Sequence, residues 1–168
     1  MKKRYKHGVL LGKFLMPHKG HKLTIEYGAS LCDLMHVIIS SKKTDKIHAN
    51  IRYFILRGEV ATSNNRVYFD IVKDLSPSTL FDELGTALNE DHWNYWIAEI
   101  KRLAPKADAI FTNDVYGERL AKELGIDWVP IDIERNLVTV SSTSITREPE
   151  RYWWDMLEGT RWALSKRI

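Results

Sequence analysis

The chain has 168 residues, of which 44% are hydrophobic and 28% charged, ordinary values for a folded globular protein. Its 25 basic and 22 acidic residues leave a net charge of +3, too small to indicate a nucleic-acid partner. This length suits a single domain over residues 1–168. Cys32 is the only cysteine, so an internal disulfide is excluded and a reducing, cytoplasmic location is predicted. No apolar segment is long enough to predict a signal peptide or a membrane span.

Short apolar runs alternate with amphipathic segments along the chain. The apolar runs predict strands at residues 7–14, 35–40, 66–72, 108–111 and 128–131. Helical periodicity predicts helices at residues 20–31, 49–61, 92–103 and 116–124. Gly125 is a typical C-cap for the last of these, and residues 76–91 fit either a short helix or a loop. The alternation indicates an α/β fold with a mostly parallel five-stranded sheet and helices on both faces.

The junction between the first strand and the first helix carries the sequence GKFLMPHKGH at residues 12–21. Such a junction presents free backbone N–H groups and the positive end of a helix dipole to an anion. His18 and His21 add two ring N–H donors, and the glycines Gly12 and Gly20 allow close approach of the backbone. A metal site is the weaker interpretation, because no third or fourth ligand has suitable spacing. The segment therefore predicts a polyphosphate pocket.

A second polar cluster, VSSTSITR at residues 140–147, follows the last predicted strand. Its hydroxyl side chains fit the start of a short helix that is capped by Ser141 or Ser142, and Arg147 adds positive charge. Ligands of parallel α/β sheets bind outside the carboxyl ends of the strands. We therefore expect this cluster to face the same pocket.

Gly12-x-Phe14 followed by His18-Lys19-Gly20-His21 resembles the GxFxPxHxGH signature of a nucleotidyltransferase superfamily that includes the nicotinamide mononucleotide (NMN) adenylyltransferases. Residues 140–145 resemble its second signature, ISSTxIR. Other segments are similar to the adenylyltransferase domain of NadR-type NAD-synthesis proteins, namely Thr112-Asn113-Asp114, Tyr116-Gly117-Glu118-Arg119, Asp132-x-x-Arg135, Glu148-Pro149 and Trp153-Trp154.

The resemblance implies a Rossmann-like nucleotidyltransferase fold and the transfer of AMP from ATP to NMN, giving NAD and pyrophosphate. It implies catalytic roles for His18 and His21 on the ATP phosphates, with at least one ring cationic once the nucleotide is bound. Mg²⁺ would arrive with ATP, because the chain shows no dedicated carboxylate cage. The expected ATP-binding residues are Gly12, Lys13, Phe14, Gly20, Asn113, Ser141, Ser142, Thr143 and Arg147.

The acceptor side is expected to use aromatic residues and one arginine. Trp93 and Trp96 stand three residues apart beside polar neighbours, so one of them stacks on the pyridine ring or both pack in the core. Tyr116 is a further candidate for this side of the site. Arg135 binds a substrate phosphate or forms a surface salt bridge. Arg52 is read as a helix-surface arginine that could assist.

Two departures from the family pattern matter. The family arginine stands three residues after the threonine, where this chain has Thr146. Arg147 follows one place later, a rotation of about 100° on a helix, so the charge comes from Arg147, Arg135 or Lys13. The chain also carries neither a helix-turn-helix segment nor a Gly-x-x-x-x-Gly-Lys-[Ser/Thr] loop, so regulator and kinase functions are expected to be absent.

The expected partners are ATP and either NMN or nicotinic acid mononucleotide, with no nucleic acid and no membrane. A homo-oligomer is left open. Two other functions compete with NMN adenylyl transfer. One is transfer of a nucleotidyl group to a different phosphate acceptor on the same scaffold. The other is a nucleotide sensor that binds without turnover, which the residue at position 146 favours.

Overall fold

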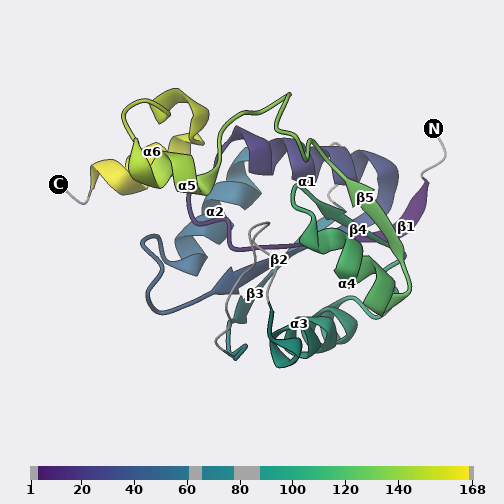
Figure 1. Ribbon diagram of the computed structural model, residues 1–168. Helices are drawn as coiled ribbons and strands as arrows, with labels where there is room; N and C mark the ends of the chain where they lie inside the picture. The colour runs from purple at the N-terminus through teal and green to yellow at the C-terminus, as the bar shows by residue number, and fades with distance from the viewer. Residues whose placement is uncertain (1–3, 61–65, 78–87, 167–168) are drawn as a thin grey trace.

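The computed structural model describes residues 4–60, 66–77 and 88–166. Within them, five strands form one sheet in the order β3-β2-β1-β4-β5, and all neighbouring strands are parallel (Figure 1). The strands are β1 (Tyr5–Gly12), β2 (Cys32–Ser41), β3 (Val67–Lys73), β4 (Ala109–Thr112) and β5 (Asp127–Pro130). This confirms the predicted parallel sheet.

Helices cover both faces of the sheet, as predicted. Helices α1 and α2 lie against one face, and α3 and α4 lie against the other (Figure 1). The helices are α1 (Lys19–Leu31), α2 (Ala49–Glu59), α3 (Glu90–Leu103), α4 (Tyr116–Leu124), α5 (Ser142–Arg147), η1 (Trp153–Asp155) and α6 (Glu158–Ser165). The predicted end of the second helix at residue 61 and most of the segment 76–91 lie outside the described residues. No described helix has both the length and the apolar character needed to cross a membrane.

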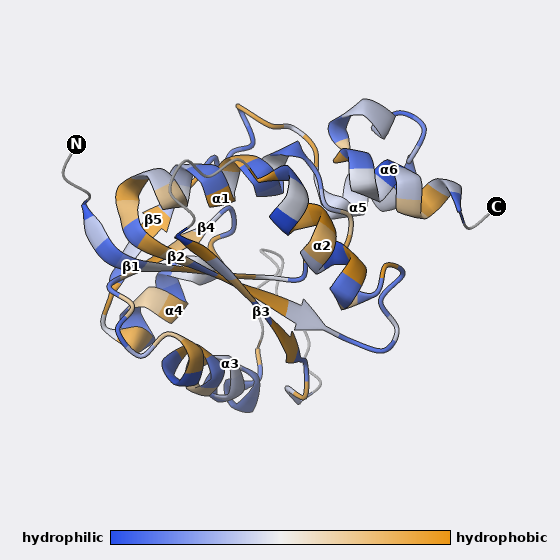
Figure 2. Cartoon of the chain, turned by 180° about the vertical axis from the view of Figure 1, so that it is seen from behind, coloured by the Kyte–Doolittle hydropathy of each residue, from blue (hydrophilic) through white to orange (hydrophobic). Residues whose placement is uncertain are grey.

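The central strands are buried on both faces, which explains their continuous apolar runs. In β2, Val37 and Ile39 belong to the core under α1 and α2, whereas Ile38 belongs to the core under α3 and α4. Figure 2 shows hydrophobic and hydrophilic residues alternating along the helices that cover these cores. Each helix therefore turns one apolar stripe toward the sheet.

Several element boundaries differ from the prediction by one to three residues. Strand β1 ends at Gly12, two residues early, because Phe14 has a φ of 50°, which no strand residue adopts. Strand β2 begins at Cys32, directly after α1, so the sequence pattern places its start too late. Gly125 has a φ of 68° and ends α4, which confirms the predicted C-cap.

Residues near the end of the described chain fasten the loop that precedes α1. The carbonyl of Pro17 accepts hydrogen bonds from the Leu157 N–H at 3.1 Å and the Thr160 hydroxyl at 2.7 Å. His18 pairs with Met156 in an isolated antiparallel bridge. A third apolar core, which includes Met16 and Met156, packs beneath this contact. The loop between β1 and α1 is thus held by hydrogen bonds to Pro17 and by the apolar packing of Met16.

Candidate functional site

A cavity of about 690 Å³ opens at the carboxyl ends of the strands. It lies where the strand order reverses between β1 and β4, the place where doubly wound sheets bind ligands. Every site residue expected from the sequence except Arg147 lines this cavity. These residues are Gly12, Lys13, Phe14, His18, Gly20, His21, Trp93, Trp96, Asn113, Tyr116, Arg135, Ser141, Ser142 and Thr143.

His18 is the N-cap of α1, and its ring orientation is fixed. Its Nδ1 accepts a hydrogen bond from the Gly20 N–H at 3.1 Å, so the neutral ring carries its proton on Nε2. A Cβ atom at Gly20 would lie 2.9 Å from Cε1 of the His18 ring. Glycine at this position is therefore what lets the capping ring fold over the helix start.

His21 stacks on His18, with ring centroids 3.8 Å apart and an angle of 28° between the planes. The Phe14 ring packs edge-on against His21 at a centroid distance of 4.9 Å. The Nδ1 atom of His21 is buried and has no hydrogen-bond partner among the described residues. A buried polar atom without a partner is uncommon in folded proteins.

Burial favours the neutral form of both histidines at neutral pH. Burial, with the Arg135 charge, lowers the pKa of His18 to about 4. Burial, with His18 and Arg135, lowers the pKa of His21 well below its usual range. The pair therefore offers ring N–H donors, and the negative charge of a bound polyphosphate would raise both pKa values.

Arg135 comes from the loop between β5 and α5. It adopts a φ of 55°, and the Asp132 carboxylate holds the loop by accepting the N–H groups of Leu137 and Val138 at 2.9 and 2.8 Å. The Arg135 guanidinium donates to the Val140 carbonyl at 3.3 Å and lies 3.4 Å from an Asp114 carboxylate oxygen. Both alternatives for Arg135 thus have structural support, because it faces the cavity and also forms an ion pair.

The serine cluster forms the predicted short helix. Ser141 caps α5 through a capping box with Ser144. The Ser142 hydroxyl accepts the Met16 N–H at 3.4 Å, which ties the cluster to the histidine loop. Thr146 and Arg147 are exposed, and Arg147 is not among the residues that line the cavity. The arginine and lysine residues of the cavity wall are Lys13, Lys42 and Arg135.

The two tryptophans are both core residues and cavity residues. Trp93 is 4% exposed and Trp96 is 6% exposed, and both pack with Leu11 and Val72. The guanidinium of Arg119 lies 4.5 Å from the ring centroid of Trp93. Core packing therefore sets the position of both rings in the cavity wall.

Two other predicted residues are oriented by hydrogen bonds. The Tyr116 hydroxyl donates to the Leu11 carbonyl at 2.8 Å, and burial raises the pKa of this phenol. The Asn113 amide oxygen accepts a hydrogen bond from the Thr24 hydroxyl at 2.7 Å. An amide oxygen has two lone pairs, so the Asn113 side chain can still both accept and donate hydrogen bonds in the cavity.

The prediction of Arg52 as a helix-surface residue is wrong. Arg52 is fully buried and donates to the Ile47 carbonyl at 2.9 Å, the Ser40 carbonyl at 3.1 Å and the Lys13 carbonyl. It also pairs with Asp45. The guanidinium therefore holds the ends of β1 and β2 in place, and its donors are not free to bind a ligand.

Sequence reasoning missed a group of cavity residues at the ends of β2 and β3. Ser40, Lys42 and Asp74 line the cavity beside the tryptophans. Their signal was available, because each lies at or just beyond the carboxyl end of a parallel strand.

No family model matches the chain. The chain is 28% identical over 160 residues to the trifunctional NAD biosynthesis/regulator protein NadR of Escherichia coli (strain K12), and 26% identical to that of Salmonella typhimurium (strain LT2). Each match covers 87% of this chain and 37% of the relative. The chain resembles NadR.

Solved structures agree on the fold. NadR protein in complex with NAD and AMP-PNP matches with a TM-score of 0.64 and 18% identity, covering 96% of this chain and 48% of that one. A bifunctional NMN adenylyltransferase/ADP ribose pyrophosphatase of Francisella tularensis, complexed with AMP and a manganese ion, matches with a TM-score of 0.55 and 17% identity. That match covers 76% of this chain and 37% of that one. The Rossmann-like fold and the resemblance to a NadR-type nucleotidyltransferase are therefore confirmed.

Proposed function

We propose that this chain is an NMN adenylyltransferase that transfers AMP from ATP to NMN, giving NAD and pyrophosphate. The observation that carries the proposal is the stacked His18–His21 pair at the start of α1, inside a cavity at the switch point of the sheet. The similarity to NadR and the structural match to an NMN adenylyltransferase support the same reaction.

The attacking group is the phosphate of the mononucleotide, whose second pKa of about 6 makes it mostly dianionic at neutral pH. One of its oxygens attacks the α-phosphorus of ATP, and the bond from that phosphorus to the oxygen bridging to the β-phosphorus breaks. The bonding electron pair leaves with pyrophosphate. No general base is needed, so the protein has to align two anions and stabilise the leaving charge.

Each phosphate-side residue has a role that fits its geometry. His18 and His21 donate ring N–H groups to the triphosphate, and Lys13 and Arg135 supply the positive charge that Arg147 does not bring to the cavity. The hydroxyls of the serine cluster and the amide of Asn113 add neutral donors. Gly12 and Phe14 let the nucleotide approach the backbone.

The divalent metal in this proposal enters with ATP. Among the described residues, no group of three or more histidine, cysteine or acidic residues is arranged to hold a metal ion. Asp132 and Asp114 do line the cavity, but the first holds backbone N–H groups and the second pairs with Arg135. A magnesium ion carried by ATP and water would neutralise part of the triphosphate charge.

A nucleotide sensor is the second candidate, and one observation favours it. The α5 position that corresponds to the family arginine is occupied by exposed Thr146, and Arg147 is not among the residues that line the cavity. A sensor would bind ATP through the same donors and release no pyrophosphate.

The deciding experiment is a chromatographic assay with ATP, magnesium and NMN, and with nicotinic acid mononucleotide in a parallel reaction. NAD formed with one equivalent of pyrophosphate is the expected result. ATP binding without any dinucleotide would contradict the proposal and favour the sensor or a different acceptor.

A further inference from the structure

One buried hydrogen bond joins the helix that carries the histidines to the end of β4. The Thr24 hydroxyl, on the second turn of α1, donates to the Asn113 amide oxygen at 2.7 Å. Thr24 is 1% exposed and is not among the residues that line the cavity, whereas Asn113 is one of them. A side chain outside the cavity wall thus holds a side chain that belongs to the wall.

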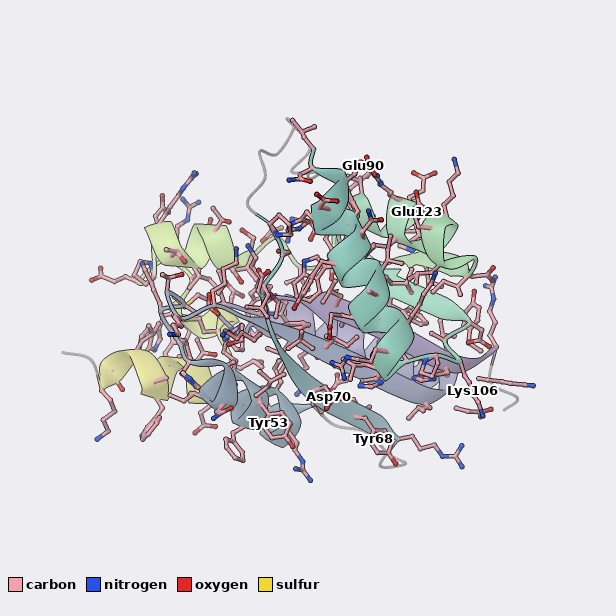
Figure 3. The ribbon with its side chains drawn as sticks, turned by 90° about the horizontal axis from the view of Figure 1, so that it is seen from below. Tyr53, Tyr68, Asp70, Glu90, Lys106 and Glu123 are labelled. Carbon is pink, nitrogen blue, oxygen red and sulfur yellow. The ribbon has the colours of Figure 1, made fainter. Side chains whose placement is uncertain are left out.

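The two residues come from opposite layers of the fold. Helix α1 packs on one face of the sheet, and Asn113 lies between β4 and α4, which packs on the other face. Figure 3 shows Glu123 on α4 beside α3, whose N-terminal end carries Glu90. The hydrogen bond therefore links the two layers at the carboxyl edge of the sheet, where β1 and β4 are neighbours.

The backbone around Asn113 is held by a different residue. The Thr112 hydroxyl accepts the ring N–H of Trp128 at 2.9 Å and donates to the Asp114 carbonyl at 2.9 Å. These hydrogen bonds fix the course of the chain, but they do not fix the side-chain torsions of Asn113. Among the described residues, the Thr24 hydroxyl is the group that hydrogen-bonds the amide of Asn113. Thr24 therefore sets the orientation of that amide.

The orientation of an amide decides which of its two polar groups meets a ligand. The oxygen of an amide accepts hydrogen bonds, whereas its NH₂ group only donates and lies on the other side of the same carbon. Because Thr24 holds the oxygen of Asn113, the NH₂ group is turned away from Thr24. The phosphate and ribose oxygens of a nucleotide are acceptors that fit such a donor.

Thr24 also contacts the residue that orients His18. Its hydroxyl lies 2.9 Å from the Gly20 carbonyl oxygen, one helical turn back, and the Gly20 N–H is the group that donates to the His18 ring. The single hydroxyl proton is thus shared between the Gly20 carbonyl and the Asn113 amide. The two contacts of Thr24 have to be separated by experiment.

Resting on the proposed function, we propose that Thr24 is a positioning residue for the nucleotide. It orients the Asn113 amide so that the NH₂ group donates to ATP, and it does not touch the ligand itself. Loss of the Thr24 hydroxyl therefore weakens the binding of ATP and not of the mononucleotide, and this effect requires Asn113.

The test measures the Kd for ATP with magnesium by calorimetry, and the KM for ATP and for NMN by steady-state kinetics. T24V removes the hydroxyl with little change of shape, so it should raise the Kd and the KM for ATP about tenfold. The KM for NMN should stay within about twofold of wild type. T24S keeps the hydroxyl and should restore the Kd for ATP to within about twofold of wild type.

S30A is the matched control on the same helix. The Ser30 hydroxyl donates to the Tyr27 carbonyl at 2.6 Å, so this variant removes a hydroxyl that bonds the helix backbone away from Asn113. S30A should leave the Kd for ATP unchanged.

A double-mutant cycle with N113A shows whether Thr24 acts through Asn113. N113A should raise the Kd for ATP about tenfold, and T24V should add nothing in the N113A background. An equal increase caused by T24V in both backgrounds would overturn the inference, because Thr24 would then act through Gly20 or through the stability of α1. If T24V does not fold, T24A takes its place in the cycle.

The inference and the proposed function fail in different ways. NAD formation with an unchanged Kd for ATP in T24V would overturn this inference alone. A wild-type protein that binds ATP, loses affinity in T24V and forms no dinucleotide would overturn the proposed function and leave the positioning role of Thr24 intact.

Discussion

Two histidine side chains make the central phosphate contacts that we propose. They act through the arrangement of their ring N–H donors rather than through a positive charge. The ring of His18 is oriented by the Gly20 N–H, and the ring of His21 is oriented by stacking on His18. Because both rings are neutral before binding, the empty cavity does not carry two buried cations. The donors are nevertheless in place when the nucleotide arrives, so little reorganisation is required.

The first prediction concerns His21. Replacing it in H21A removes a ring N–H donor that stabilises the leaving pyrophosphate, so kcat should fall by about 10² or more. Steady-state kinetics with saturating ATP and NMN measure this directly. Near-normal kcat in a folded H21A protein would remove His21 from the phosphate site.

At the scale of elements, α3 joins the aromatic wall to the sheet. In W96A, we expect the KM for the pyridine mononucleotide to rise much more than the KM for ATP, because the ring loses its stacking surface. The same change empties part of the core and should lower the free energy of unfolding by about 3–5 kcal/mol. W96L keeps much of the apolar volume but has no aromatic ring, so it separates the two effects. Equal changes in both KM values for W96L would contradict a stacking role.

Arg52 joins three elements in the same way, from α2 to the ends of β1 and β2. R52M removes the charged partner of the half-buried Asp45 carboxylate and the donor to three carbonyls. We expect a loss of about 3–5 kcal/mol in the free energy of unfolding, measured by chemical denaturation. The exposed residue Arg57 on the same helix is the matched control, and R57M should change stability by less than about 0.5 kcal/mol.

The five strands and helices α1 to α5 were predictable from the sequence, whereas η1, α6 and most element ends were not, for physical reasons. Apolar runs such as residues 37–39 mark strands buried on both faces, and that pattern survives in any fold of this class. The end of β1 depends on the positive φ of Phe14, which no periodicity reveals. The burial of Arg52 depends on carbonyls from three separate segments, so its sequence position resembles that of an ordinary helix-surface arginine.

The residues of the candidate site were also only partly predictable from the sequence. Residues within recognisable signatures, such as His18 and Ser141, line one cavity as the sequence suggested. Ser40 and Asp74 belong to no signature, because their place in the cavity wall comes from the register between β2 and β3. Arg147 lies beside a signature, but it does not line the cavity. Its position on α5, and not its residue type, decides this.

For the whole molecule, the histidines make stability depend on pH. Burial lowers the pKa of His7, His18 and His21 in the folded protein, and for His18 the value is about 4. Between pH 6.5 and 4 the unfolded chain therefore binds more protons than the folded chain, and stability decreases as the pH falls. Thermal unfolding across this range should show a steady decrease in Tm, smaller in an H18Q variant. A flat profile from pH 7 to 4.5 would contradict buried, neutral rings.

The contact between Pro17 and the segment around Thr160 has a consequence for biosynthesis. The two residues that share this hydrogen bond are 143 positions apart, so nearly the whole chain is synthesised before they can meet. A nascent chain that has not reached residue 160 lacks this hydrogen bond, whereas the hydrogen bond from Arg52 to the Lys13 carbonyl can already form. We therefore expect the loop with His18 to reach its final geometry late in synthesis.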